Sequence, residues 1–194
     1  MKNLINPMLA VLLISVASCT KAPLQTPATA NTASNDEAAS PGQEFYVGQH
    51  YGGGVIFFLD STKLHGLIAD TVDLGSYSWY NGIYLLTDAQ STRIGAGHKN
   101  TKRIVLAQGK NGSYAALECT KSKHSGYSDW FLPSKDELNK MYRLRYVIGG
   151  FTNNVYWSSS EDYDHSSWLE AFANGKQGTD FKSESYFVRA ARSF

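Results

Sequence analysis

Hydrophobic and polar positions divide the 194-residue chain into three stretches. Residues 9–16 are almost wholly apolar and follow a single basic residue, Lys2. Residues 20–43 are rich in Ala, Thr, Ser, Pro and Asn, a composition that buries too little apolar surface to offset the entropy of ordering, and we interpret them as a linker. From Phe45 onward aromatic residues are dense, which predicts one globular domain over residues 44–194.

The N-terminal pattern is typical of an export signal. Its apolar run is shorter than the ~20 residues that a membrane-spanning helix needs, and it ends at Val16-Ala17-Ser18-Cys19. This ending resembles the lipobox of bacterial lipoproteins. The resemblance implies that residues 1–18 are a signal peptide, that Cys19 carries the lipid, and that residues 19–43 tether the domain to the membrane. An ordinary signal peptide with a chance cysteine at the cleavage site is the alternative.

The lipoprotein class also implies a location. No Asp follows Cys19 in Cys19-Thr20-Lys21, which favours the outer membrane over retention in the inner one. The pattern leaves open whether the domain lies on the periplasmic face or at the cell surface.

Within the domain, short apolar runs predict strands. A Gly-Gly-Gly turn at 52–54 precedes the apolar run 55–59, and 64–69 is its expected partner. Further extended segments are expected at 77–80, 156–160, 168–173 and 186–191, with Asn174-Gly175 as a hairpin turn.

Three segments predict helices. Residues 101–108 form the first, with Asn100 or Thr101 as N-cap, and residues 113–123 form the second. The third begins at Ser134, which has Glu137 at the reciprocal position of a capping box, and ends at Gly149-Gly150.

Four stretches of this domain resemble a known family in sequence and in order. They are Tyr51-Gly52-Gly53-Gly54-Val55-Ile56-Phe57-Phe58, Gly126-Tyr127-Ser128-Asp129-Trp130-Phe131-Leu132-Pro133-Ser134 with Glu137-Leu138, Tyr156-Trp157-Ser158-Ser159-Ser160-Glu161, and Val188-Arg189-Ala190-Ala191-Arg192. They are similar to domains first grouped as DUF1566 and named after the C-terminal domain of the Legionella collagen-like adhesin. The resemblance implies an α+β, C-type-lectin-like fold of small antiparallel sheets with two or three helices.

The two cysteines matter in different ways. If Cys19 carries lipid, Cys119 is the remaining thiol and no internal disulfide forms. Many relatives have cysteines at the positions of Cys119 and Ala190. The resemblance therefore implies that this chain has lost half of a disulfide, and that the two residues are buried neighbours. Trp130, Leu132, Trp157 and Phe172 are expected in the core, with Trp130 and Trp157 in one cluster, and Pro133 is expected to be structural. The alternative is that the two tryptophans lie on the surface as a stacking platform for sugar rings.

The charge of the chain limits the classes of partner that it is expected to bind. The formal net charge is +1, so no strong basic field favours nucleic acid. Basic residues nevertheless gather in one stretch, where they either face a sulfated or phosphorylated glycan or simply solvate two helices: Lys99, Lys102, Arg103, Lys110, Lys121 and Lys123.

Acidic residues offer only a weak metal site. Glu161, Asp162 and Asp164 lie beside His165 in an expected loop, where they either hold Ca²⁺ or remain a solvated acidic turn. The histidines lack zinc-ligand spacing, and no Gly-x-Ser-x-Gly elbow is present. We therefore expect no metal, no cofactor and no catalytic group.

Three functions remain possible from the sequence. The resemblance favours an adhesin-like binding module for a polysaccharide or an envelope protein, without catalysis. The sugar-binding triplets of calcium-dependent C-type lectins are absent, which argues against that mode of binding. The alternatives are an envelope enzyme on a lectin-like scaffold of the formylglycine-generating type, which needs paired cysteines, and a structural subunit of an envelope assembly.

Overall fold

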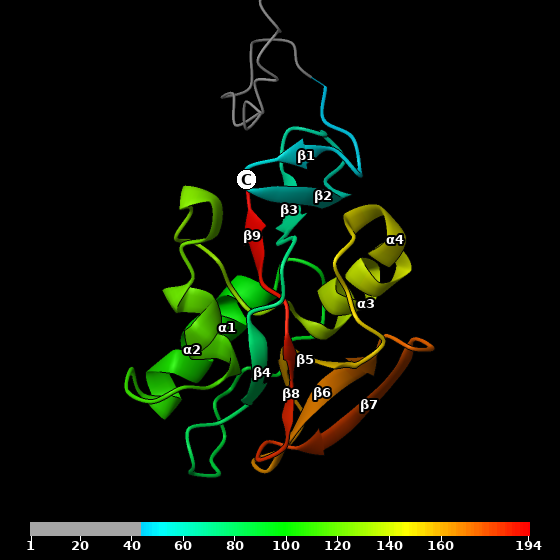
Figure 1. The fold of residues 1–194 in the computed structure, drawn as a ribbon. Coiled ribbons are helices and arrows are strands. Elements are labelled where there is room, and N and C mark those ends of the chain that lie inside the picture. Colours follow the sequence, from blue (N-terminus) through cyan, green and yellow to red (C-terminus); the bar gives the residue numbers. More distant parts are fainter. Residues whose placement is uncertain (1–43) are drawn as a thin grey trace, which may run out of the picture. The chain divides into compact units, whose positions relative to one another are not determined.

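The computed structural model describes residues 44–194, which form an α+β domain with two β-sheets (Figure 1). The first sheet is antiparallel and has the order β1-β2-β3-β9. Its strands are β1 (His50–Tyr51), β2 (Gly54–Leu59), β3 (Gly66–Ala69) and β9 (Ala191–Ser193). The first and last strands of the described chain thus share a sheet, and the ring centroids of Phe45 and Phe194 lie 4.9 Å apart.

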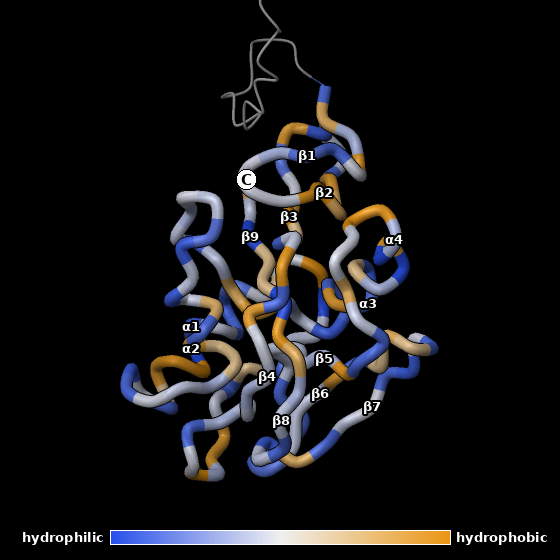
Figure 2. Tube along the Cα trace, in the orientation of Figure 1, coloured by the Kyte–Doolittle hydropathy of each residue, from blue (hydrophilic) through white to orange (hydrophobic). Residues whose placement is uncertain are grey.

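The second sheet has the order β4-β8-β5-β6-β7. Its strands are β4 (Gly75–Ser78), β5 (Val155–Glu161), β6 (Ser166–Ala171), β7 (Lys176–Phe181) and β8 (Ser185–Val188). The β5–β8 pairing is parallel and the others are antiparallel. The expected turn at Asn174-Gly175 joins β6 to β7, and Figure 2 shows that β7 is mostly hydrophilic.

Helices flank the sheets in two pairs. They are α1 (Gly97–Gln108), α2 (Ala115–Lys121), α3 (Lys135–Arg143) and α4 (Arg145–Ile148), with a 3-10 turn at His124–Gly126. α1 contacts β5 and α2 contacts β4, whereas α3 contacts β2, β5 and β6. Figure 1 shows the two pairs on opposite sides of β4 and β8. None of the helices in residues 44–194 has the length and apolar composition needed to cross a membrane.

The core consists of two hydrophobic clusters. The first surrounds Trp79, Trp130 and Trp157 and includes apolar residues of α1 and α2; the second surrounds Tyr156 and Phe172 and includes those of α3 and α4. Trp130, Leu132, Pro133, Trp157 and Phe172 are all buried, and Trp130 and Trp157 share a cluster, so the expected core is confirmed.

Three of the signature stretches meet where the sheets join. Phe131 pairs with Ala191 as an antiparallel bridge, and the Ser159 amide donates to the Pro133 carbonyl over 2.8 Å. The Arg192 guanidinium binds both carboxylate oxygens of Asp129, at 2.8 and 3.0 Å. These residues therefore act as connectors of the fold.

Several predicted boundaries are wrong, for reasons that lie in tertiary structure. The expected strand 186–191 is split between the two sheets, because the buried Arg189 turns away to bind Asp73 (Nε to Oδ1, 2.7 Å). The third helix is interrupted at Leu144, and the second is shorter at both ends than expected. The first helix begins at Gly97, with Ala96 rather than Asn100 or Thr101 as N-cap.

Cys119 is a buried free thiol, and it lies in the same hydrophobic cluster as the buried Ala190. Burial and the neighbouring Asp70 carboxylate raise the pKa of this thiol well above its usual value. Bridging geometry between positions 119 and 190 stays a prediction, as does the C-type-lectin-like assignment. The signal peptide, Cys19 and the linker lie outside the described residues.

Candidate binding site

The site begins with the way α1 is held. Its buried positions are largely polar: Asn100 donates to the Ser91 carbonyl over 2.6 Å, and Thr101 Oγ1 accepts from the Leu132 amide over 3.0 Å. At the C-terminal end, Gln108 Oε1 accepts from the Asn81 amide over 2.9 Å. Because these contacts use one face of α1, Lys102, Val105 and Leu106 remain on its accessible side.

The N-terminus of α1 is capped by a side chain from another helix. The Glu137 carboxylate, which completes the predicted capping box with Ser134 on α3, also accepts from the Gly95 amide over 2.7 Å and from the Gly97 amide over 3.3 Å. Burial raises the pKa of Glu137, while the amide donors act in the opposite direction. A side chain on Gly97 would collide with this carboxylate, so glycine permits the close approach of α1 to α3.

A short loop turns the chain from α1 into α2. Tyr114 is buried at its end and donates its hydroxyl to the Gly109 carbonyl over 2.6 Å. The buried residues of α2 are Ala115, Ala116, Leu117 and Cys119, and the small side chains among them let α2 sit close to the core. The opposite face presents Thr120 and Lys121.

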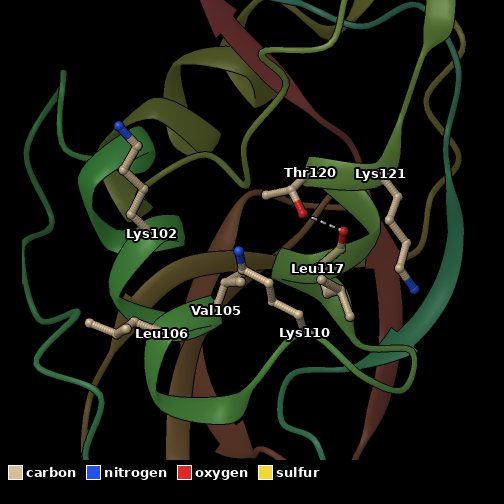
Figure 3. A pocket seen from close by; sticks show the side chains of 7 residues that line it. All are labelled: Lys102, Val105, Leu106, Lys110, Leu117, Thr120 and Lys121. Carbon is tan, nitrogen blue, oxygen red and sulfur yellow. Dashed lines mark hydrogen bonds between the residues drawn. The ribbon is translucent and has the colours of Figure 1, made fainter.

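Between α1 and α2 lies a hollow of about 530 Å³, which we call the α1–α2 groove (Figure 3). Its lining comes from both helices and their loop: Lys102, Val105, Leu106, Lys110, Leu117, Thr120 and Lys121. Figure 3 shows Lys102 on α1 and Lys121 on α2 at opposite sides, with Lys110 between them. Leu106 is 86% exposed, so an apolar surface is open to a ligand.

The groove is cationic at its rim. Lys102, Lys110 and Lys121 line it, and none of its lining residues is acidic. Lys121 Nζ lies 2.9 Å from Glu118 Oε1 and also donates to the Gly112 carbonyl, so part of its charge is already balanced. Exposed pairs of this kind contribute only about 0–1 kcal/mol, which leaves Lys121 available to exchange partners.

Two other hollows differ in charge. One of about 350 Å³ next to β9 includes Asp60, and one of about 310 Å³ on the β6–β7 face includes Asp180. A carboxylate in the lining would repel an anionic ligand. The α1–α2 groove is therefore the hollow of these three that suits an anion.

The structure brings together part of the predicted basic stretch. Lys102, Lys110 and Lys121 line the groove, while Lys99 and Lys123 are exposed but do not line it. Arg103 is half-buried and donates to the Asp88 carbonyl. The sequence analysis missed the apolar members Val105, Leu106 and Leu117. No signal in the sequence marked them, because the exposure of Leu106 and the burial of the polar face of α1 are properties of the fold.

A model of the Lcl C-terminal domain family matches residues 74–192, which is more than half of the chain. The chain belongs to the Lcl C-terminal domain family. The matched region contains the α1–α2 groove and the signature stretches beginning at 126, 156 and 188, and it excludes the expected opening stretch at 51–58. A search among curated proteins finds no match to this chain. The Lcl C-terminal domain family is not an enzyme family, and a domain of this adhesin-like family is compatible with a binding module.

Inside this Lcl C-terminal domain, the acidic residues that were expected in one loop have a different arrangement. Glu161 is neither solvated nor in a loop, because it ends β5 and is buried against Lys182, 2.7 Å from Oε1 to Nζ. Asp162 accepts from the Ser166 hydroxyl, and Asp164 pairs with His165. Within residues 44–194, no three His, Cys, Asp or Glu side chains are grouped to hold a metal ion.

The Glu161–Lys182 pair is a structural link that the sequence analysis missed. Lys182 also donates to the Leu85 and Asp164 carbonyls, and the Thr87 amide donates to both Glu161 oxygens at 2.9 Å. Burial lowers the pKa of Lys182, and its contact with Glu161 acts in the opposite direction. Both side chains are fully buried, and the pair ties the loop after β4 to β5.

Proposed function

We propose that this protein is a lipid-anchored envelope lipoprotein whose α1–α2 groove binds an anionic polysaccharide. The observation that carries the proposal is that three lysines from three successive segments line one apolar hollow whose lining residues include no acidic residue. The whole chain has a formal net charge of only +1, so this local concentration of positive charge is not a reflection of composition.

The chemistry of the groove suits a sulfated or carboxylated sugar polymer. Lysine ammonium groups are compact charges on flexible stems, so they follow anionic groups along a polymer without fixed geometry. The C–H faces of sugar rings are apolar enough to cover Val105, Leu106 and Leu117. Charge and apolar contact are thus both available within one site.

The anchor rests on the sequence alone. Val16-Ala17-Ser18-Cys19 supports lipidation of Cys19, and the absence of Asp after it supports the outer membrane. Three fatty acyl chains hold a protein at a bilayer far more firmly than one, because each buried CH₂ contributes about 0.8 kcal/mol.

An acidic, amphipathic protein segment is the second candidate ligand, since Leu106 offers an exposed apolar contact next to the lysines. The enzyme alternative has less support. Chemistry of the formylglycine-generating type needs paired cysteines, whereas Cys119 is a single buried thiol in the described part of the chain.

The proposal is tested by binding of dextran sulfate to two charge-matched variants of the full chain. Lys102→Gln/Lys110→Gln/Lys121→Gln removes the groove charges, and Lys63→Gln/Lys140→Gln/Lys176→Gln removes three exposed lysines elsewhere. Three contacts of about 0.5 kcal/mol each sum to roughly 1.5 kcal/mol, so the groove variant should bind about tenfold more weakly.

The control variant should retain its affinity at the same ionic strength, and neutral dextran should not bind the parent chain. Equal weakening of both variants would mean that binding follows net charge and not the groove. Binding of an acidic peptide in preference to dextran sulfate would favour the protein ligand.

A further inference from the structure

Four large side chains lie exposed at the end of the domain where the described chain begins. Tyr46 is 64% exposed, Val47 42%, Tyr146 85% and Val147 53%. We call these four residues the tyrosine–valine patch. They come from two segments, the turn before β1 and the helix α4.

The two segments are in direct contact. A Cβ atom on Gly48 would lie 2.9 Å from Val147 Cγ1, so the backbone after Val47 passes against α4. A hydrogen bond from the Gln49 amide to the Tyr46 carbonyl, 3.2 Å long, closes the turn. The four side chains therefore belong to one surface.

A cation lies beneath this surface. The Arg145 guanidinium lies 4.2 Å from the ring centroid of Tyr142 and 4.3 Å from that of Tyr146, and it donates to the Tyr146 hydroxyl over 3.2 Å. Lys140 and Arg143 are exposed on the adjoining helix α3, and the exposed acids nearest in sequence to the two segments are Glu44 and Asp136. Lys140, Arg143 and Arg145 therefore outnumber the exposed acids nearest in sequence to the patch.

The patch is close in sequence to the proposed lipid anchor. Tyr46 follows Glu44 by two residues, and only residues 20–43 separate Glu44 from Cys19. A chain of this many residues, treated as a random coil, has a root-mean-square span of roughly 25–30 Å. A surface this close to its anchor meets the bilayer at a high effective concentration, so weak contacts are sufficient for adsorption.

We propose that the tyrosine–valine patch rests on the bilayer that holds the lipid anchor, an inference that depends on the proposed lipidation of Cys19. Tyrosine suits the headgroup region because its ring is apolar and its hydroxyl is polar. The valines enter the boundary of the acyl chains, and Arg145 complements the lipid phosphates.

This contact orients the domain. Figure 1 shows α4 and β1 at the end where the described chain begins, and α1 and α2 well away from them. With the patch on the bilayer, the α1–α2 groove is held clear of the lipid and open to a polymer. With this second contact, the anchored domain keeps one orientation relative to the membrane.

The test uses the lipidated full chain in phosphatidylethanolamine–phosphatidylglycerol vesicles with brominated acyl chains, which quench nearby tryptophan emission. Tyr146→Trp places a reporter in the patch, and Leu106→Trp places one in the groove. Emission of the parent chain, from its four native tryptophans, is subtracted. The patch reporter should lose emission because interfacial groups lie about 5–10 Å into the headgroup and acyl boundary, and the groove reporter should not.

Adding Tyr46→Ser, Val47→Ser and Val147→Ser to Tyr146→Trp should abolish the quenching while the protein still floats with the vesicles. Flotation with an unquenched patch reporter would overturn this inference and leave the anchor intact. Patch-to-patch cross-linking without quenching would assign the surface to a second copy and would also overturn it. Failure of the chain to float would refute the lipid anchor and, with it, the bilayer contact.

Discussion

At the scale of single residues, Glu170 gives the domain a pH-dependent stability. Its buried carboxylate accepts from Asn139 Nδ2 over 2.9 Å and from Gln177 Nε2 over 3.3 Å, and burial raises its pKa from 4.5 to about 7. Since the folded state favours the protonated form, its contribution to stability is full below pH 4.5 and is lost as pH rises through 7.

We predict that Glu170→Gln removes this loss. At about 1.4 kcal/mol per pKa unit, the free energy of unfolding of the variant relative to the parent should rise by up to roughly 3 kcal/mol between pH 4.5 and pH 8. Urea unfolding across this range measures the difference, with the exposed Glu184→Gln as control. A difference between variant and parent that does not change with pH would contradict the assignment.

Cys119 supports a second residue-scale prediction. Ala190→Cys places a thiol in the same buried cluster, and the resulting disulfide should add about 2–4 kcal/mol to the free energy of unfolding. A thiol count under denaturing conditions, together with thermal unfolding with and without reductant, measures the outcome. Two free thiols after oxidation would show that positions 119 and 190 lack bridging geometry.

At the scale of elements, the Glu161–Lys182 pair fastens β5 to the loop after β4. Glu161→Gln leaves the buried Lys182 charge without its partner, and we expect a cost of about 3–5 kcal/mol. The double variant Glu161→Leu/Lys182→Met should recover most of this loss, because buried ion pairs are often replaceable by packed apolar groups. Denaturant unfolding of the three chains tests the expectation, and a double variant no more stable than the single one would contradict it.

The sequence pattern predicted those features that depend on contacts between residues close together in the chain. The capping box of Ser134 and Glu137 is a contact within four residues, and it was confirmed. The start of α1 was not predictable in this way, because the acceptor for its first amides comes from Glu137 on another helix. The break between β8 and β9 likewise depends on Asp73, 116 residues before Arg189.

The candidate site was predictable to a similar degree. The lysines were evident as a cluster of charge, but convergence on one groove depends on how α1 and α2 pack. The buried polar contacts of α1 set the direction of its exposed face, and a hydropathy pattern does not reveal them. Glu161 was predicted wrongly in the opposite way. The acidic stretch indicated a solvated or metal-binding loop, but in the fold Glu161 forms a buried ion pair with Lys182.

At the scale of the whole molecule, we propose two tasks for two surfaces. In this proposal the tyrosine–valine patch rests on the bilayer and the α1–α2 groove binds the polysaccharide. The family signatures lie between them and hold the sheets together through Asp129, Arg192 and the Phe131–Ala191 bridge. Variation in the groove can therefore change ligand preference without disturbing these connections.

The most direct measurement of the central claim is a methyl and amide NMR titration of the full chain in detergent with a sulfated oligosaccharide of defined length. We predict shifts concentrated on Val105, Leu106, Leu117 and Thr120, weakened by salt as screened charges require, and absent with the desulfated sugar. Shifts centred on another face, or equal shifts with the desulfated sugar, would contradict binding in the α1–α2 groove.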